Sequence, residues 1–412
     1  MEPWGEPFLD PLHGHQAQGS LICNAATVPQ QAPAFLLILI YLGFVSLGFP
    51  DGALGAAWPQ MRAGLGLPVG LAGILTMVAT LLSAASSLSS TAIIKRGRTG
   101  VVVLVSGCLT GGALVMIARA PSFVWLVVAA VPLGLGAGAV DASLNGYVAR
   151  HYSGRHMNWL HACWGIGATA GPLVMTQAVR SPDGWRGGYL ALGAAQLMLA
   201  LIFLVTLRLW DTAETSRPTT TQATTGTNPP NSEAGWLSPL IFAVYVGVEL
   251  MVGLWGASLL VESRGVAPAA AGLASSAYYG AITIGRIMVG TVVNRWGNRR
   301  MVRLGLGIAL LGAALLFRAN TAALGTAALL LIGLGLAPVY PCLMHEVPRR
   351  FTPDGGLVVV ARQSSAAYLG CALLPAAIGW LAQRRSLETL PVAVIAGLLC
   401  LLLVVGRLDR VS

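Results

Sequence analysis

Residues 211–235 read DTAETSRPTTTQATTGTNPPNSEAG and form the longest polar stretch in the interior of the sequence. Thr, Pro and Asn dominate this stretch, and such a composition is typical of a flexible linker. The sequence on both sides of it is apolar, so the linker divides the chain into two units of similar length. The predicted parts are a tail over 1–33, a first unit over 34–209, the linker over 210–236, a second unit over 237–407 and a terminus over 408–412.

The composition indicates that lipid, not water, surrounds most of the chain. Hydrophobic residues make up 55% of the sequence and charged residues only 10%, whereas soluble domains carry about a quarter charged residues. A membrane-spanning helix needs about 20 predominantly apolar residues. Twelve stretches qualify: 34–58, 70–93, 101–118, 122–149, 158–179, 188–209, 237–260, 267–293, 302–318, 320–344, 357–382 and 388–407. Open sheets cannot satisfy their backbone in lipid, so we predict an all-α membrane protein with twelve transmembrane helices.

The two units resemble each other in sequence. GLG at 134–136 recurs at 333–335, and Arg150 then corresponds to Arg349. Gly167 and Pro172 correspond in the same way to Gly370 and Pro375. Parallel six-helix repeats are a known transporter construction with the substrate site at the repeat interface. We therefore expect two pseudo-symmetric six-helix bundles.

Charge and cysteine patterns narrow the class further. The formal net charge is +10, but the basic residues lie in short loops, as membrane topology requires, so we expect no nucleic-acid partner. More of these residues flank the linker side of the predicted helices, which places both termini in the cytoplasm and the protein in the cell membrane. The six cysteines show no metal-binding spacing. We expect no metal, no cofactor and a monomer in the lipid bilayer.

Ionisable residues inside predicted helices are costly and therefore mark function. Asp51 follows Pro50 in the first stretch, and Asp141 shares a helix face with Asn145 in the fourth. Burial favours the protonated form of a carboxylic acid, which is the property that a proton carrier needs. The alternatives are a helix-capping role for Asp51 and, for Asp141, an ion pair that closes a gate.

Glu249 lies near the middle of the seventh stretch, where an unpaired charge is least tolerable. Tyr245 shares its face and Trp255 lies about two turns away. An acid beside aromatic rings suits a sugar and equally an organic cation, while the competing interpretation is an interhelical hydrogen bond. Asp51, Asp141 and Glu249 are the predicted proton-coupling residues.

Polar and aromatic residues in other helices complete the predicted substrate site. His161 and Trp164 lie one turn apart in the fifth stretch, and Arg286 in the eighth either extends to the interface or pairs with an acid. The predicted substrate-binding residues are Asn145, His161, Trp164, Tyr245, Glu249, Trp255, Tyr279, Tyr340 and Gln363. Packing against neighbouring helices is the alternative for His161 and for the tyrosines.

The loops after the second and eighth stretches carry a pair of related motifs. Both motifs resemble the pattern G-x3-D-R-x-G-R-R of the major facilitator superfamily. The second copy matches it with Gly290, Asn294, Arg295, Gly297 and Arg299, where Asn294 stands in the place of Asp. The first copy matches it with Lys95, Gly97 and Arg98. The resemblance covers nearly the whole chain. It implies two bundles around a central cavity that opens alternately to each side, and a gating role for these loops.

A narrower resemblance is to the fucose permease branch of proton-coupled sugar symporters. It involves the acids Asp51 and Asp141 and the start of the fifth stretch, NWLHACWGIG, with Asn158. This resemblance implies proton-coupled uptake of a sugar-like or other small polar solute. Gly167-x3-Gly171-Pro172 matches half of an antiporter signature, so proton-driven drug or metabolite export is the alternative. The histidines are scattered and form no catalytic cluster, which argues against an enzyme. A large sensory domain is not recognisable in the sequence, which argues against a receptor.

Overall fold

A computed structural model describes residues 34–94, 99–152, 154–214 and 226–412. The first half contains α1 (Ala34–Leu65), α2 (Leu71–Ile94), α3 (Thr99–Ala118), α4 (Phe123–His151), α5 (Gly154–Val179), α6 (Gly184–Val205) and the short α7 (Leu207–Glu214). The second half contains α8 (Glu233–Ser258), its π-helical extension η1 (Leu259–Ser263), α9 (Pro268–Trp296), α10 (Asn298–Arg318), α11 (Ala322–Leu336), α12 (Val339–Arg350), α13 (Pro353–Arg384) and α14 (Thr389–Val411). The predicted all-helical class is confirmed for the described residues.

Every predicted apolar stretch overlaps one of these helices. Within the described residues, nine helical segments are long and apolar enough to cross a membrane, and Leu71–Ser87 is a shorter apolar segment. The helices α5 and α9 are absent from that set; α5 contains the predicted site residues His161 and Trp164, and α9 contains Tyr279 and the charged Arg286. Twelve membrane crossings therefore stay a prediction.

The stretch predicted over 320–344 is divided into two helices. The helix α11 ends at Leu336, and α12 begins at Val339 after Ala337 and Pro338. Proline has no backbone N–H and clashes with the preceding turn, so a helix interior is disrupted there. The break lies directly before Tyr340, one of the predicted site residues.

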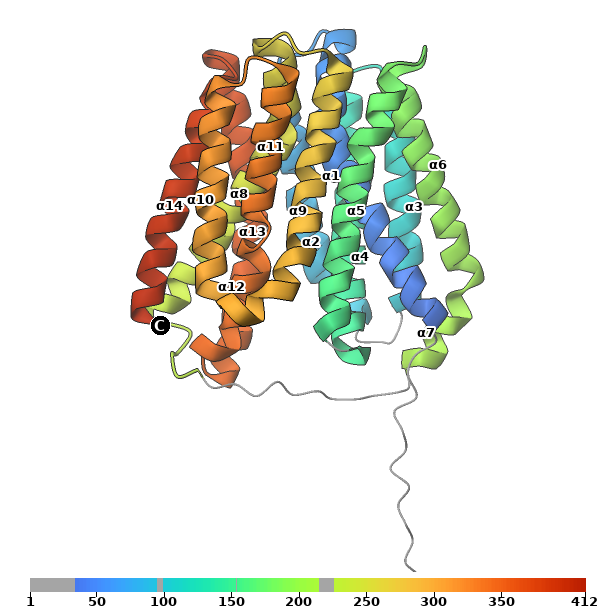
Figure 1. The fold of residues 1–412 in the computed structure, drawn as a ribbon. Coiled ribbons are helices and arrows are strands. Elements are labelled where there is room, and N and C mark those ends of the chain that lie inside the picture. Colours follow the sequence, from blue (N-terminus) through green and yellow to red (C-terminus); the bar gives the residue numbers. More distant parts are fainter. Residues whose placement is uncertain (1–33, 95–98, 153, 215–225) are drawn as a thin grey trace, which may run out of the picture.

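The two halves stand side by side, with α1–α6 in blue to green and α8–α14 in yellow-green to red in Figure 1. We call the end of the bundle that holds α7 and the C-terminus the linker end, and the opposite end the distal end. Glycines allow close helix contacts within and between the halves: a Cβ at Gly48 or Gly52 would overlap the backbone of α5, and one at Gly55 would overlap the backbone of Gly253 in α8. Such contacts bring α1 against both α5 and α8.

Candidate functional site

Asp51 lies in the middle of α1, where that helix packs closely against α5. The Nε1–H group of Trp164 on α5 donates a hydrogen bond of 2.9 Å to Oδ2 of Asp51. The Asp51 side chain is exposed although it lies deep in the bundle, because it faces an internal cavity. Its carboxylate is thus held by a neutral donor and is open to small molecules.

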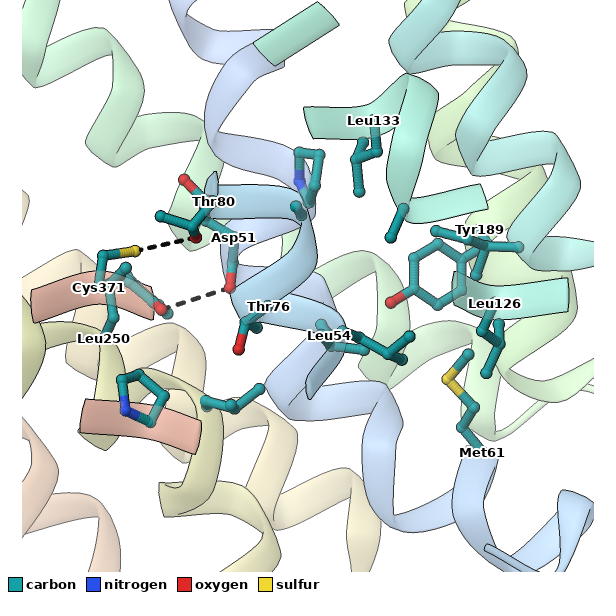
Figure 2. Close-up of a pocket in the computed structure, with 18 residues that line it drawn as sticks. Asp51, Leu54, Met61, Thr76, Thr80, Leu126, Leu133, Tyr189, Leu250 and Cys371 are labelled. Carbon is teal, nitrogen blue, oxygen red and sulfur yellow. Dashed lines mark hydrogen bonds between the residues drawn. The ribbon is translucent and has the colours of Figure 1, made fainter. Parts of the chain in front are cut away.

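The cavity beside Asp51 has a volume of about 110 Å³. Figure 2 shows Asp51 among Leu54, Thr76, Thr80, Leu126, Leu133 and Cys371, which come from both halves. Thr80 on α2 and Cys371 on α13 form a hydrogen bond of 3.3 Å across the two halves. The residues that line the cavity are mostly apolar. Asp51 is the charged residue among them, and only a few of the others are polar.

Tyr279 connects α9 of the second half to this site. Its hydroxyl group donates a hydrogen bond of 3.4 Å to the backbone carbonyl of Asp51. Its ring packs edge-on against Trp164, with the centroids 6.3 Å apart. Gly253 on α8 makes this approach possible, because a Cβ there would overlap the tyrosine hydroxyl. The predicted residues Asp51, Trp164 and Tyr279 therefore meet.

A buried ion pair lies in the second half. The Nη2 atom of Arg286 on α9 is 3.2 Å from Oε2 of Glu249 on α8, and the side chains are only 14% and 6% exposed. The Tyr245 hydroxyl also donates to Glu249. The Tyr278 hydroxyl donates to the Glu249 backbone carbonyl at 2.8 Å. Of the two alternatives for Arg286, pairing with an acid is the one observed.

Arg286 joins this ion pair to the first half. Its guanidinium carbon lies 5.5 Å from the centroid of the Trp164 ring, within the range of a cation–π contact. Trp164 thus contacts Asp51 through its Nε1–H group and Arg286 through its ring. The three predicted proton-coupling acids have different partners: Asp51 bonds Trp164 directly, whereas Glu249 is connected to Trp164 through Arg286.

Asp141 forms a separate polar group on α4. Asn145 donates a hydrogen bond of 2.9 Å to its Oδ1 atom, as the shared helix face predicted. Tyr368 on α13 donates a hydrogen bond of 3.4 Å to Oδ2. No ion pair of Asp141 occurs among the described residues, so its partners are neutral like those of Asp51.

His161 and Tyr340 meet between the halves, with ring centroids 6.0 Å apart. Tyr340 also contacts the ring of Tyr245, at 6.3 Å. The break between α11 and α12 places Tyr340 at the start of a helix, close to the Glu249–Arg286 pair. These ring contacts connect α5, α8 and α12.

Trp255 and Gln363 lie elsewhere than the Asp51 cavity. Both are completely buried; Trp255 donates to the Pro375 carbonyl at 2.9 Å, and Gln363 donates to Ser238 at 2.6 Å. These bonds link α8 to α13. Their predicted contact with substrate stays a prediction.

The loop motifs are only partly described. Lys95, Gly97 and Arg98 fall outside the described residues. In the second copy, Gly290, Asn294 and Arg295 lie in the last turns of α9, and Gly297 has a φ of 78° between α9 and α10. Arg299 donates to the backbone carbonyls of Asp409 and Ser412 at 3.2 and 3.0 Å, which attaches the motif to the end of α14.

A network of charges surrounds this attachment at the linker end. Asp409 is 2.8 Å from Arg350 and 2.7 Å from Arg303. Glu346 accepts from Asn298 at 2.5 Å. From the sequence, Arg303 and Arg350 indicate only topology, because basic residues near helix ends are expected in membrane proteins.

At the distal end an ion pair connects the halves. Arg62 at the end of α1 lies 2.5 Å from Glu262 in η1. A Cβ at Gly73 of α2 would overlap the backbone of Ala376 in α13, and one at Gly70, just before α2, would overlap the backbone of Gly379. This contact holds the halves together above the Asp51 cavity.

Comparison with known proteins agrees with this architecture. A family model described as Major Facilitator Superfamily matches residues 40–240 and again residues 237–410. The chain belongs to the major facilitator superfamily. It is a membrane transporter, not an enzyme, as predicted.

The relatives leave the solute open. An uncharacterized MFS-type transporter of Yersinia pestis is 24% identical over 361 residues, which are 83% of this chain and 89% of the relative. An uncharacterized transporter of Sinorhizobium fredii (strain NBRC 101917 / NGR234) is 26% identical over 282 residues, 65% of this chain and 70% of the relative. They identify a superfamily transporter without naming what it carries.

Solved structures show the same fold at low identity. A bacterial homologue of the human lysosomal transporter Spinster, in an inward-facing and occupied conformation, aligns with a TM-score of 0.75 at 14% identity, covering 92% of this chain and 97% of that one. A D-xylose–proton symporter aligns with a TM-score of 0.68 at 14% identity, covering 90% and 96%. The fucose permease branch is not specifically matched by these comparisons, so it stays a resemblance.

Several residues at the site were not singled out from the sequence. Tyr368 bonds Asp141, and the Thr80–Cys371 pair joins the halves beside the cavity. Hydroxyl and thiol groups are common in transmembrane helices, where they bond many different partners. Only the rotation of each helix, which the sequence does not specify, distinguishes the residues that face the centre.

Proposed function

We propose that this transporter is a proton-coupled symporter that takes up a small polar solute, sugar-like in size, by alternating access. One observation carries the proposal: the Asp51 carboxylate is bonded by the neutral Trp164 and faces a cavity at the contact between the halves. A carboxylate without a cation is costly inside a membrane. Binding a proton removes that cost, so Asp51 is suited to carry the proton.

The solute would bind beside Asp51, near Trp164 and Tyr279, with Glu249 and Arg286 within reach of its polar groups. In this proposal the linker end faces the cytoplasm of the cell and the protein works as a monomer. The Arg62–Glu262 contact is then a gate on the outer side, which must open to admit solute. Arg299 and its partners would brace the inner side of the second half.

A second candidate is proton-driven export of an apolar compound. The walls of the Asp51 cavity favour it, because Leu54, Leu75, Leu126 and Leu133 would contact an apolar body. Asp51 would then exchange a proton for a cationic group. Uptake and export differ in the direction of the proton relative to the solute.

Proteoliposomes with an enclosed pH-sensitive dye and no imposed gradient distinguish the two candidates. Addition of a transported polar solute to the outside should acidify the interior, and the Asp51→Asn variant should lose this signal. Alkalinisation on adding hydrophobic cations, with silence across sugars, polyols and small acids, would overturn symport in favour of exchange. Asp183→Asn is a matched control, because Asp183 is an exposed acid between α5 and α6.

A further inference from the structure

Arg286 has more hydrogen-bonding capacity than the protein uses. Its three bonds to Tyr245 and Glu249 all come from Nη2, at 3.2 to 3.3 Å. The Nε–H group is buried and has no hydrogen-bond partner among the residues that the structure describes. A guanidinium group carries five N–H donors in a planar fork, and a buried donor without an acceptor is unfavourable.

The ion pair itself is loosely made. Charge-assisted N–H···O bonds are typically about 2.7–2.9 Å long, and those between Arg286 and Glu249 are longer. A structural pair that only joined α8 to α9 would be expected to use both edges of the fork. The free donor and the long bonds indicate a cation that is prepared to receive a second acceptor.

We infer that the transported solute carries a carboxylate group and that Arg286 is the residue that binds it. The inference rests on the proposed proton-coupled uptake and narrows its solute to a small polar acid. A carboxylate matches the two-pronged geometry of guanidinium, which a single hydroxyl group does not. The Trp164 ring beside Arg286 offers an apolar face to the carbon skeleton, and the Tyr340 and Tyr245 hydroxyls lie nearby for hydroxyl groups of the solute.

The balance of charge distinguishes an acid from a neutral solute. If Asp51 and Glu249 are taken as negative and Arg286 as positive, these three groups together carry one net negative charge in the empty site. When a proton binds Asp51 and a carboxylate binds Arg286, the net charge is again one negative. The loaded and empty carriers then cross the same electrical barrier, and one proton and one carboxylate move together without net charge. A neutral solute would make the same cycle electrogenic.

Matched pairs of solutes test the inference in proteoliposomes that contain the full chain. Gluconate is compared with sorbitol, and glucuronate with glucose, because each acid differs from its partner by one carboxylate and neither crosses lipid readily. The initial rate of internal acidification should be at least tenfold higher with each acid than with its neutral partner. A potential imposed with potassium and valinomycin should leave that rate unchanged, and protein-free vesicles give the background.

Variants of the ion pair provide a second measurement. Arg286→Lys keeps the charge but loses the fork, so the KM for the acid should rise about tenfold. Glu249→Gln removes the competitor for Arg286, so the same KM should fall. Glu249→Gln/Arg286→Gln removes both charges without leaving one unpaired and should abolish transport of the acid. The control Arg264→Gln/Glu388→Gln removes the ion pair at the distal end, 2.5 Å long, and should leave KM unchanged.

Each outcome is decisive. Acidification by sorbitol or glucose that persists in Glu249→Gln/Arg286→Gln would overturn the carboxylate inference and leave proton-coupled uptake intact. Acidification by the acids that is unaffected in this double variant would also overturn the role of Arg286. Silence with all four solutes would overturn proton-coupled uptake of a sugar-like solute and the inference with it.

Discussion

Asp51 and Glu249 are both carboxylates near the middle of a membrane-embedded bundle, one in each half, yet their surroundings differ. Asp51 accepts from the neutral Trp164 and faces a cavity, whereas Glu249 is buried against the positive Arg286. The two carboxylates are thus accommodated in two different ways, and Trp164 contacts both Asp51 and the partner of Glu249. The charge of Glu249 is balanced by Arg286, whereas Asp51 has no cation partner among the described residues and would be neutralised by a bound proton.

The difference assigns separate tasks to the two halves. A group whose charge is already balanced gains little from binding a proton, so the second half is suited to recognise solute. The unbalanced acid in the first half is suited to bind and release the proton. Asp141 resembles Asp51 in this respect, because its partners Asn145 and Tyr368 are neutral.

The largest expected effect comes from replacing each of the two acids, in separate variants, by its amide. Asp51→Asn should reduce solute-driven acidification at least a hundredfold, about 3 kcal/mol in the coupled step at about 1.4 kcal/mol per tenfold. Glu249→Gln should retain proton coupling with an altered KM. The dye assay in proteoliposomes measures both, and equal loss in the two variants would contradict the division of tasks.

The same two substitutions should differ in their effect on stability. Glu249→Gln leaves Arg286 buried without its partner, and removing one member of a buried pair costs about 3–5 kcal/mol. Asp51→Asn removes no cation partner and should cost less than about 1 kcal/mol. Unfolding of purified protein in mixed micelles measures the free energies. Glu249→Gln/Arg286→Gln should recover most of the loss, and no recovery would show that the pair is not coupled.

Sequence reasoning located the helices well because lipid imposes length and composition on each of them. It also selected Asp51, Trp164 and Tyr279, which meet although they are far apart in the chain. It left the partner of Arg286 open and treated Trp255 like Trp164. Hydropathy is nearly uniform around these helices, so the sequence gives no information on which face of each helix turns to the centre.

The two tryptophans provide a smaller test of that distinction. Trp164→Phe removes the bond to Asp51 and should raise KM several-fold with little loss of stability. Trp255→Phe removes the bond to the Pro375 carbonyl, so it should lower the free energy of unfolding by about 1 kcal/mol and leave KM unchanged. A raised KM in Trp255→Phe would instead support its predicted contact with solute.

The smallest effect concerns the distal ion pair Arg62–Glu262, which is the outer gate of the proposed cycle. Arg62 and Glu262 are 30% and 19% exposed, and such pairs contribute about 0.2–1 kcal/mol. Arg62→Ala should therefore raise the reaction rate of Cys371, which lines the Asp51 cavity, with a charged thiol reagent added at the distal end by about two- to fivefold. The measurement uses a chain in which the other cysteines are replaced by serine.

Charge reversal separates the ion pair from the packing around it. Arg62→Glu/Glu262→Arg restores opposite charges and should return the labelling rate of Cys371 to its original value, while Arg62→Glu alone should raise it most. If Cys371 reacts at the original rate in Arg62→Ala, Arg62→Glu and Arg62→Glu/Glu262→Arg, then the contacts of Gly70 and Gly73 with α13 keep the distal end closed without help from the charges. The cost of opening would then lie in helix packing, and both acids would stay shielded from the distal side whatever the state of the pair.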